Sequence, residues 1–324
     1  MSGGTVLVTG GAGYIGSHVV QALRRAGRPV LVVDDLSSGD AARVDDVPIL
    51  RLDLAEQGSA PRIAAAAREH DVALVVHLAA RKRVDESLRR PLWYSEQNVT
   101  GLLVLLRALA DMDVRGFLFS SSAAVYGVTG DTPVTEQDPT SPVNPYGRTK
   151  LIGEQLLRDV SRATGLRTVS LRYFNVAGAG DPALADRGTG NLVTMTVDAL
   201  RHGRTPEVFG TDYPTPDGTC VRDFVHVQDV ADAHVAALDG LDRGDTLPDV
   251  LNVGTGQGAS VLQVVEHLCA AAGRPGGWVA RPRRAGDPPA VVADASRIHE
   301  VLGWHASRRL DEMLSSAWEA PLVG

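Results

Sequence analysis

The sequence is poor in cysteine and in positive charge, and it contains no long apolar run. Its 324 residues include two cysteines, Cys220 and Cys269, which leave no disulfide framework and too few thiolates for a cysteine-rich zinc site. The 32 Lys and Arg residues against 39 Asp and Glu give a net charge of −7, which argues against non-specific binding to nucleic acid or to an anionic membrane. The most apolar stretch, residues 101–110, contains Arg107 and is too short to span a bilayer. We therefore expect no nucleic-acid partner, no membrane partner and no metal.

Targeting signals and repeats are also missing from the sequence. Only Met1 to Gly4 precede the first apolar run, so we expect no signal peptide and a cytoplasmic location. The length suggests about two domains, and a chain that is 44% hydrophobic can bury a sizeable core. There is no internal repeat and no low-complexity tract.

In the first half, short apolar runs alternate with helical patterns. We predict strands at residues 5–9, 30–33, 49–52, 73–78, 116–120 and 168–171. We predict helices at residues 14–26, 61–70 and 96–110, and a further helix that begins at Pro145. This alternation predicts a doubly wound α/β fold of the Rossmann type, in which a parallel sheet has helices on both faces.

The second half has a different rhythm. Gly, Pro and Asp cluster at residues 178–190 and 210–218, which predicts long surface loops. Helices are expected at residues 191–201, 227–238, 261–271 and 310–318, and short strands at residues 208–209, 250–253 and 279–281. We therefore predict a cofactor-binding domain at residues 1–176, to which part of residues 224–253 returns. Residues 177–324 are expected to form a smaller α+β substrate-binding region over the ligand end of the sheet.

A glycine-rich turn follows the first predicted strand. Gly10, Gly13 and Gly16 form the G-x-x-G-x-x-G variant of the dinucleotide fingerprint. Such glycines permit a tight turn and let backbone amides approach a pyrophosphate at the positive end of a helix. Because the strand, the turn and the helix are all present, we predict that this turn, including Tyr14 and Ile15, binds a dinucleotide.

Two acidic residues end the second predicted strand. Asp34 follows Gly10 by 24 residues, and Asp35 adds a second negative charge. A carboxylate at this position hydrogen-bonds ribose hydroxyls and repels a 2′-phosphate, which predicts NAD rather than NADP as the cofactor. The alternative is that Asp34 only caps the strand and starts a turn, but the neighbouring glycine turn favours the cofactor role.

The next two predicted strands end at the same edge of the sheet. Ligands of open α/β sheets bind at the carboxyl ends of the strands. We therefore predict that the cofactor also contacts the residues at these strand ends: Asp53, Leu54, Leu78, Ala79 and Ala80.

Tyr146 and Lys150 form the predicted catalytic pair. They stand four residues apart, after Asn144 as a plausible N-cap and Pro145 at the first helical position, so both lie on one helical face. A lysine at that distance favours the phenolate by roughly 2–3 kcal/mol at an effective dielectric near 20. Tyr146 is therefore predicted to be a general base near neutral pH. The alternative is an ordinary aromatic–lysine pair on a helix.

Three serines at residues 120–122 favour the catalytic interpretation. They follow the fifth predicted strand at its carboxyl end. A hydroxyl there can hold both the tyrosine oxygen and a hydroxyl of the substrate. The three elements together predict a proton-transfer site beside the dinucleotide.

The glycine turn, the serine and the Tyr-x-x-x-Lys pair resemble the extended short-chain dehydrogenase/reductase superfamily. Within it, the chain resembles the UDP-glucose 4-epimerases over nearly its whole length. The similar segments are TGGAGYIGSH from Thr9, HLAARKRV from His77, FSSSAAVYG from Phe119, NPYGRTKLIGEQ from Asn144, LRYFNVAGA from Leu171, VFGTDYPTPDGTCVRDFVHVQDVADAHVAAL from Val208 and LNVGTGQGASVLQVV from Leu251. The resemblance implies an NAD-dependent isomerase that inverts the 4-hydroxyl of UDP-galactose and UDP-glucose through a 4-keto sugar. It also implies a homodimer, for which we expect contacts at residues 96–110 and 151–160.

The resemblance assigns roles to individual residues. Ser122 becomes the catalytic hydroxyl, with Tyr146 as the base and Lys150 as its electrostatic partner. Four further residues are implied to contact the cofactor: Ser38, Lys82, Asn98 and Tyr173. Lys82, Ser122 and Tyr146 are also implied to contact the substrate.

The implied UDP-sugar site lies in the second half. Asn175, Asn191 and Leu192 would border the sugar and diphosphate, and Val208 and Phe209 the uracil. Arg222 and Arg284 would bind the phosphates, because guanidinium groups match phosphate oxygens bidentately. Asp287 would bind the uridine ribose, and Val291 would line the hexose cavity. Taken alone, Arg222 could instead form a weak surface pair with Asp223, and Asp287 could be a plain turn residue.

Three other functions remain as alternatives. Sugar-nucleotide 4,6-dehydratases place an acidic pair after the catalytic hydroxyl, where this sequence has Ala123 and Ala124. A non-catalytic nucleotide sensor would typically lack the tyrosine or the lysine, and both are present. The third alternative is activity on UDP-N-acetylhexosamines, alone or in addition, because the small Val291 leaves space in the hexose cavity.

Overall fold

Seven strands form the main sheet of the computed structural model, which describes residues 4–130, 132–188, 190–284 and 287–321. The strand order is β10-β6-β5-β4-β1-β2-β3, and every neighbouring pair is parallel. The strands are β1 (Thr5–Thr9), β2 (Val30–Asp34), β3 (Ile49–Arg51), β4 (Val72–His77), β5 (Gly116–Ser122), β6 (Arg167–Tyr173) and β10 (Val250–Val253). The prediction of a Rossmann-type parallel sheet is confirmed.

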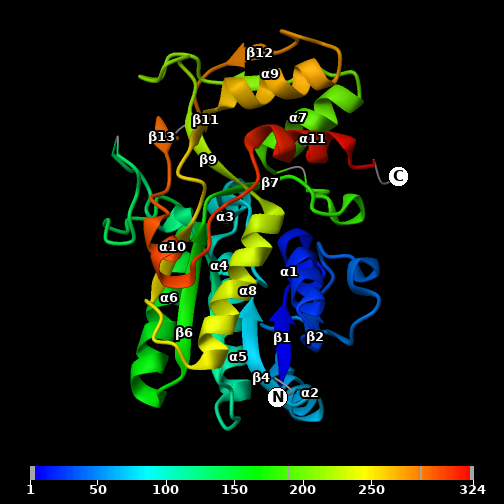
Figure 1. Ribbon diagram of the computed structural model, residues 1–324, viewed down its shortest axis with the longest axis vertical. Coiled ribbons are helices and arrows are strands. Elements are labelled where there is room, and N and C mark those ends of the chain that lie inside the picture. Colours follow the sequence, from blue (N-terminus) through cyan, green and yellow to red (C-terminus); the bar gives the residue numbers. More distant parts are fainter. Residues whose placement is uncertain (1–3, 131, 189, 285–286, 322–324) are drawn as a thin grey trace.

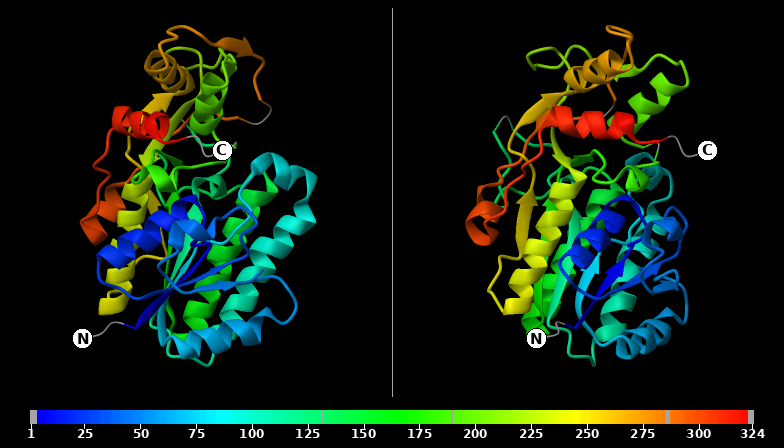
Figure 2. Two further views of the ribbon diagram at one scale, coloured as in Figure 1. Left: turned by 90° about the vertical axis from the view of Figure 1, so that its right-hand side faces the viewer. Right: turned by 45° about the vertical axis from the view of Figure 1, so that its right-hand side comes forward.

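Helices cover both faces of this sheet (Figure 2). On one face, α1 (Tyr14–Arg25) and α8 (Val227–Arg243) pack on the side chains of Val6 and Val8. On the other face, α2 (Ser59–Glu69), α5 (Gly101–Leu109) and α6 (Pro145–Thr164) enclose Leu7 between these two valines. Successive side chains of a strand point to opposite faces of the sheet. The side chains of an almost continuously apolar strand therefore pack alternately into the cores on the two faces.

One segment from the second half of the chain belongs to the sheet. The strand β10 pairs with β6, with Val250 opposite Ser170, and α8 packs against α1. Residues 227–253 therefore lie with the first half of the chain, in the lower part of Figure 1.

A smaller part lies beyond the carboxyl ends of the main strands, in the upper half of Figure 1. Its central strand β9 (Val221–His226) pairs in parallel with β7 (Asn175–Ala177) and β13 (Ala290–Val291), and antiparallel with β11 (Gly258–Ser260). A separate parallel pair joins β8 (Glu207–Phe209) to β12 (Val279–Arg281). Three helices enclose the core of this part: α7 (Leu192–Arg201), α9 (Val261–Ala271) and α11 (Leu310–Glu319).

Several elements differ from the sequence prediction. The single helix expected at residues 96–110 is a π-turn, η2 (Glu96–Thr100), followed by α5. The strand β9 was not predicted, because Arg222 and Asp223 interrupt its apolar pattern. The short helices α3 (Val84–Arg89), α4 (Pro91–Ser95) and α10 (Ser296–Leu302) were also not predicted.

Three short 3₁₀ turns complete the description: η1 (Ala41–Val44), η3 (Ala123–Val125) and η4 (Pro182–Leu184). Within the described residues, no helix is both long enough and apolar enough to cross a membrane. The same residues contain no cluster of three or more His, Cys, Asp or Glu side chains arranged to hold a metal ion.

Candidate active site

A cleft of 410 Å³ lies at the carboxyl ends of the main strands. It is lined by almost every residue that the sequence assigns to the cofactor: Gly10, Gly13, Tyr14, Ile15, Gly16, Asp34, Asp35, Ser38, Asp53, Leu54, Leu78, Ala79, Ala80, Lys82, Tyr146, Lys150 and Tyr173. The exception is Asn98. Because these residues come from distant parts of the chain, their convergence follows from the parallel strand order and not from proximity in sequence.

The glycine turn at the base of the cleft fits a dinucleotide. Gly10 has a φ of +72°, and a Cβ atom on Gly16 would lie 2.0 Å from the Gly10 carbonyl oxygen. The turn is therefore closed to any side chain at residue 16. Gly13 precedes α1, and no side chain caps the first turn of that helix, so its amides remain suited to an anion such as pyrophosphate.

Asp34 has two roles in the structure. One carboxylate oxygen accepts a hydrogen bond from the Ala12 amide at 3.0 Å, and the other accepts from the Leu36 amide at 2.9 Å. The residue thus fixes the glycine turn and starts the next turn, while it also lines the cleft. Burial of the side chain raises the pKa of Asp34, and these two amides oppose that shift.

Asn98 lies behind the wall of the cleft and fixes the backbone of that wall by hydrogen bonds. Its side-chain oxygen accepts from the Arg81 amide at 2.7 Å, and its nitrogen donates to the Arg81 carbonyl oxygen at 3.0 Å. The same nitrogen donates to Thr149 Oγ1 on α6 at 2.9 Å. The π-turn η2 carries Asn98, so this wider helical turn aims the amide at residue 81, next to Lys82.

The three predicted catalytic residues meet at one end of the cleft. Ser122 ends β5, and Tyr146 lies in the first turn of α6, where the Asn144 side chain caps the helix by accepting from the Gly147 amide at 2.8 Å. The Ser122 hydroxyl lies near Tyr146 and lowers the pKa of its phenol, and Ser122 Oγ accepts a hydrogen bond from the Ala124 amide at 3.2 Å. Lys150 lies one helical turn further, and its Nζ atom donates to the Ser120 carbonyl oxygen at 2.8 Å.

The electrostatics of this group differ from the prediction. Burial raises the pKa of Tyr146, and the nearby Ser122 hydroxyl opposes the shift. Burial also lowers the pKa of Lys150 to about 7, while the nearby Glu154 carboxylate opposes that shift. The expected fall in the tyrosine pKa is therefore wrong for the chain by itself, because removing the phenolate from water outweighs the attraction of a lysine that is itself desolvated.

Two buried supports of the catalytic group were missed in the sequence. His234 on α8 lies 2.8 Å from Ser120 Oγ, and its other ring nitrogen lies 2.8 Å from the Val230 carbonyl oxygen. Burial lowers the pKa of His234 to about 4, so the ring is neutral: it donates to Val230 and accepts from Ser120. No sequence signal linked these residues, because they lie 114 positions apart.

The second support is a buried ion pair on the other side of the serines. Arg172 on β6 donates two hydrogen bonds to Glu154, at 2.9 and 2.6 Å, and Ser121 Oγ donates to the same carboxylate at 2.5 Å. Glu154 stands four residues after Lys150 on α6. That spacing was the one available signal, because it places both side chains on one helical face.

Residues 178–188, which we call the strap, pass from the smaller part across α1. The Tyr14 hydroxyl donates to the Gly178 carbonyl oxygen at 2.5 Å, and Arg43 donates to the Ala185 carbonyl oxygen at 2.7 Å. The last three residues of the strap line the cofactor cleft. The sequence predicted only a surface loop here, so its contacts with the cofactor-binding half were missed.

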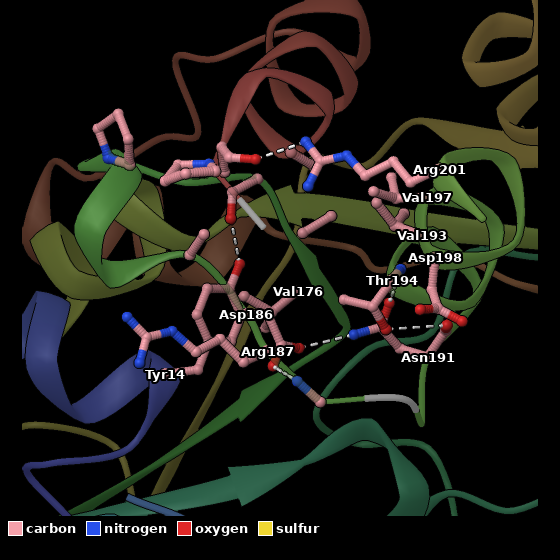
Figure 3. Close-up of a pocket in the computed structure, with 18 of the residues that line it drawn as sticks. Tyr14, Val176, Asp186, Arg187, Asn191, Val193, Thr194, Val197, Asp198 and Arg201 are labelled. Atoms are coloured by element: carbon pink, nitrogen blue, oxygen red, sulfur yellow. Dashed lines mark hydrogen bonds between the residues drawn. The ribbon is translucent and has the colours of Figure 1, made fainter. Parts of the chain in front are cut away.

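A second cavity, of 390 Å³, lies on the other side of the strap (Figure 3). It is bordered by the strap, by α7 and by the end of α11. Asn191 caps α7 by accepting from the Thr194 amide at 2.9 Å, and its side chain donates to Asp186 of the strap at 2.8 Å. The strap is therefore attached to both parts of the molecule.

The residues assigned to uracil and phosphates form two contact pairs in the smaller part. The Arg284 guanidinium carbon lies 4.1 Å from the centre of the Phe209 ring. Arg222 donates to the Pro288 carbonyl oxygen at 3.0 Å, and its guanidinium lies 3.8 Å from the Asp287 carboxylate. The structure thus brings each arginine next to another residue of the predicted substrate site.

The alternative role of Arg222 as a surface pair with Asp223 is wrong. The Arg222 side chain is only 15% exposed. Asp223 is fully buried and points the other way, where its oxygens accept from the amides of Thr255, Gly256 and Ala293. Asp223 therefore fixes the backbone around β9 and does not neutralise its neighbour.

The other predicted substrate residues are more dispersed. Asn175 is exposed at the start of β7, and Leu192 begins α7. Val291 lies in β13 opposite Arg222 and packs on an apolar cluster around Tyr126. Val208 is fully buried in the core of the smaller part, so its side chain does not reach a surface that a ligand could contact.

Comparisons with known proteins cover almost the whole chain. Residues 6–254 match the model of the NAD dependent epimerase/dehydratase family. The UDP-glucose 4-epimerase of Azospirillum brasilense is 46% identical over 325 residues, which cover 98% of this chain and 92% of the relative. A crystal structure of UDP-glucose-4-epimerase from Stenotrophomonas maltophila, with bound NAD and formylated UDP-arabinopyranose, has a TM-score of 0.91 and 42% identity, covering 98% of this chain and 97% of that one. The UDP-Glc/GlcNAc 4-epimerase of Campylobacter jejuni has a TM-score of 0.85 and 36% identity, covering 98% of both chains.

Proposed function

The chain belongs to the NAD-dependent epimerase/dehydratase family, and we propose that it is an NAD-dependent UDP-glucose 4-epimerase, an isomerase that interconverts UDP-galactose and UDP-glucose. The observation that carries this proposal is the position of Tyr146 and Lys150 in the lining of the glycine-turn cleft, with Ser122 next to Tyr146. The relatives named above, which carry this activity in their names, support it.

Tyr146 is proposed to take the proton of the sugar 4-hydroxyl and to return it. Ser122, whose hydroxyl lies near the tyrosine, would orient that oxygen and bond the same hydroxyl of the substrate. NAD in the cleft would accept the hydride of carbon 4 and give it back, and its positive ring would favour the Tyr146 phenolate. Lys150, held by the Ser120 carbonyl, places a second cationic group one helical turn away.

The smaller part is proposed to anchor the UDP group while the sugar turns. Arg222 and Arg284 would bind the diphosphate, Asp287 the uridine ribose, and Phe209 would pack on the uracil. Inversion requires the 4-keto sugar to present both of its faces to the same cofactor ring. The hexose must therefore be held less tightly than the nucleotide.

We propose the UDP-N-acetylhexosamines as a second, less favoured substrate class. The feature behind it is the small side chain of Val291, at the position that the resemblance assigns to the hexose cavity. The name of the Campylobacter jejuni relative shows that both sugar types occur among chains of this fold. The experiment below also tests this substrate class.

We further propose a cytoplasmic homodimer that serves galactose metabolism. The exposed apolar side chains that could pair two copies lie on α3, α4 and the start of α6: Val84, Leu88, Leu92 and Ile152 are 44%, 61%, 85% and 38% exposed. The helix α5, expected at the contact, buries Leu102 and Leu105 within its own chain. The dimer is therefore proposed through α3, α4 and α6.

The test is formation of UDP-glucose from UDP-galactose, detected by coupling to a UDP-glucose dehydrogenase that reduces added NAD. The proposal expects continuous turnover by the purified chain without a net change in its own bound cofactor. Parallel assays with UDP-N-acetylgalactosamine measure the second substrate class. Turnover of neither sugar, by a preparation that contains bound dinucleotide, would contradict the proposed function.

A further inference from the structure

Arg81 lines the cofactor cleft beside the two acidic residues that end β2. Both of its backbone groups are fixed by Asn98, as described above. Its guanidinium carbon lies 5.0 Å from the centre of the Trp93 ring, and the side chain is 19% exposed. The sequence motifs assign no role to this arginine. It is nevertheless held firmly at the end of the cleft where the adenosine ribose of the cofactor is expected.

The guanidinium group of Arg81 donates four hydrogen bonds to its neighbours. It donates to an Asp35 carboxylate oxygen at 2.5 Å and to Gln97 Oε1 at 2.8 and 3.1 Å, and also to Ser37 Oγ. The other oxygen of Asp35 accepts from the amide and hydroxyl of Ser37, at 2.9 and 2.6 Å. The carboxylate is thus held against the arginine by a local turn.

The position of this pair has a chemical consequence. In dinucleotide-binding sheets, the acidic residue that ends the second strand binds the ribose of NAD, whereas a nearby arginine accommodates the 2′-phosphate of NADP. A guanidinium fork matches phosphate oxygens bidentately, but it can do so only when its donors are free. Here Gln97 accepts from two nitrogens of the Arg81 guanidinium, and Asp35 accepts from one of the same nitrogens and adds a negative charge of its own.

We propose that the Asp35–Arg81 pair determines the choice between NAD and NADP. Asp35 holds the arginine away from a 2′-phosphate and repels that phosphate, while Asp34 remains the ribose ligand. Loss of the Asp35 charge removes one of the hydrogen bonds that hold Arg81 and the negative charge beside it, and the same cleft then accepts NADP as well. The inference rests on the proposed function, because it requires the cleft to hold a nicotinamide dinucleotide.

The experiment measures which dinucleotide the full-length chain retains. Wild type, Asp35→Asn, Arg81→Met and the double variant are incubated with equimolar NAD and NADP until the bound composition is constant. Free dinucleotide is removed by gel filtration, and the bound molecules are extracted and quantified by chromatography. Asp40→Asn is the matched control, since Asp40 lines the same cleft but pairs with Arg187.

Asp35→Asn is expected to shift the bound NADP-to-NAD ratio toward NADP by about tenfold or more, the worth of a charge-assisted hydrogen bond. Adding Arg81→Met is expected to remove most of that gain. Arg81→Met alone and Asp40→Asn are expected to leave the ratio within about twofold of wild type. Asp35→Ser serves as a second variant, because it removes the same charge without an amide.

Three results would overturn the proposal. The first is an unchanged ratio of bound NADP to bound NAD in both Asp35 variants, when both variants still retain NAD. The second is an equal gain in the double variant, which would assign the selectivity to charge repulsion alone. The third is an equal gain in Asp40→Asn. A wild-type chain that retains neither dinucleotide would contradict the proposed function itself, and this inference with it.

Discussion

The two parts of the molecule hold their functional residues in different ways. At the ends of the main sheet, Tyr146 and Lys150 are buried, 8% and 3% exposed, and Lys150 is hydrogen-bonded to the end of β5. In the smaller part, Arg284 is exposed, and its described contact is with the Phe209 ring. The proposed catalytic residues thus lie on buried elements, and the proposed nucleotide anchors lie on short strands and loops.

This difference suggests a division of labour in the kinetics. Changes at the enclosed end should lower kcat, because they remove interactions made in the transition state. Changes at the anchors should raise KM, because they remove binding that is equal in the ground state and the transition state. The four predictions below test this division, beginning with the largest expected effect.

Tyr146→Phe removes the proposed base and leaves the ring in place. We expect kcat to fall by about 10²–10⁴-fold, the usual worth of a general base, with KM changed by less than about threefold. Steady-state assays of UDP-galactose turnover measure both constants, and the amount of bound NAD serves as the control for an intact cleft. Near-full activity of the variant would remove Tyr146 from its assigned role.

The variant Lys150→Met tests how much the burial of the charged lysine destabilises the folded chain. The pKa of Lys150 lies at about 7, below its ordinary value of 10.5. Between pH 7 and 10.5, Lys150 is therefore protonated to a greater extent in the unfolded chain than in the folded chain. The free-energy cost of burying its charge is present in full below pH 7 and decreases as the pH rises to 10.5.

We expect the Lys150→Met variant to be nearly inactive and yet more stable than wild type at pH 7, by about 1–3 kcal/mol after loss of the bond to Ser120. Denaturant unfolding at pH 7 and pH 9.5 measures the free energy of unfolding. The advantage of the variant should be smaller at pH 9.5. A variant less stable than wild type at both pH values would contradict the account of the enclosed end.

Arg284→Met tests the anchors, with Arg283→Met as its neighbour and matched control. We expect the first to raise the KM for UDP-galactose by about 10–100-fold with little change in kcat. Arg283 instead contacts Asp212 and the Tyr213 ring, so its replacement should change KM by less than about twofold. Equal effects of the two variants would point to long-range charge in place of a specific phosphate contact.

Arg43→Met weakens the attachment of the strap to the cofactor-binding half. Loss of the bond to the Ala185 carbonyl is expected to speed release of bound NAD by about five- to tenfold, with kcat almost unchanged. Release is followed by the NAD content of the protein over time after dilution. Arg25→Met, an exposed change at the end of α1, is the control, and equal release from both variants would deny the strap a role in retention.

The sequence could predict most of the enclosed end and less of the anchors. In a parallel sheet, residues that follow successive strands must meet at one edge, so Gly10, Asp34, Asp53 and Leu78 could be assigned to one cleft without a structure. The register of β9 could not be predicted in this way, because Arg222 and Asp223 break its apolar pattern while they point to opposite sides.

Burial was the other property that the sequence concealed. The spacing of Tyr146 and Lys150 predicted their proximity, but the direction of the tyrosine pKa depends on the walls around it, which include β5 and β6. The same holds for His234 and for Asn98. Each supports the cleft through contacts that only the tertiary structure brings about.

The central claim is that carbon 4 is inverted by removal and return of its own hydride. The most direct test is conversion of UDP-galactose by the purified chain in deuterium oxide, with the product analysed by proton NMR. The account predicts UDP-glucose that carries no deuterium at carbon 4, because the hydride stays on the cofactor and does not exchange with solvent. Deuterium at carbon 4 of the UDP-glucose formed would contradict it.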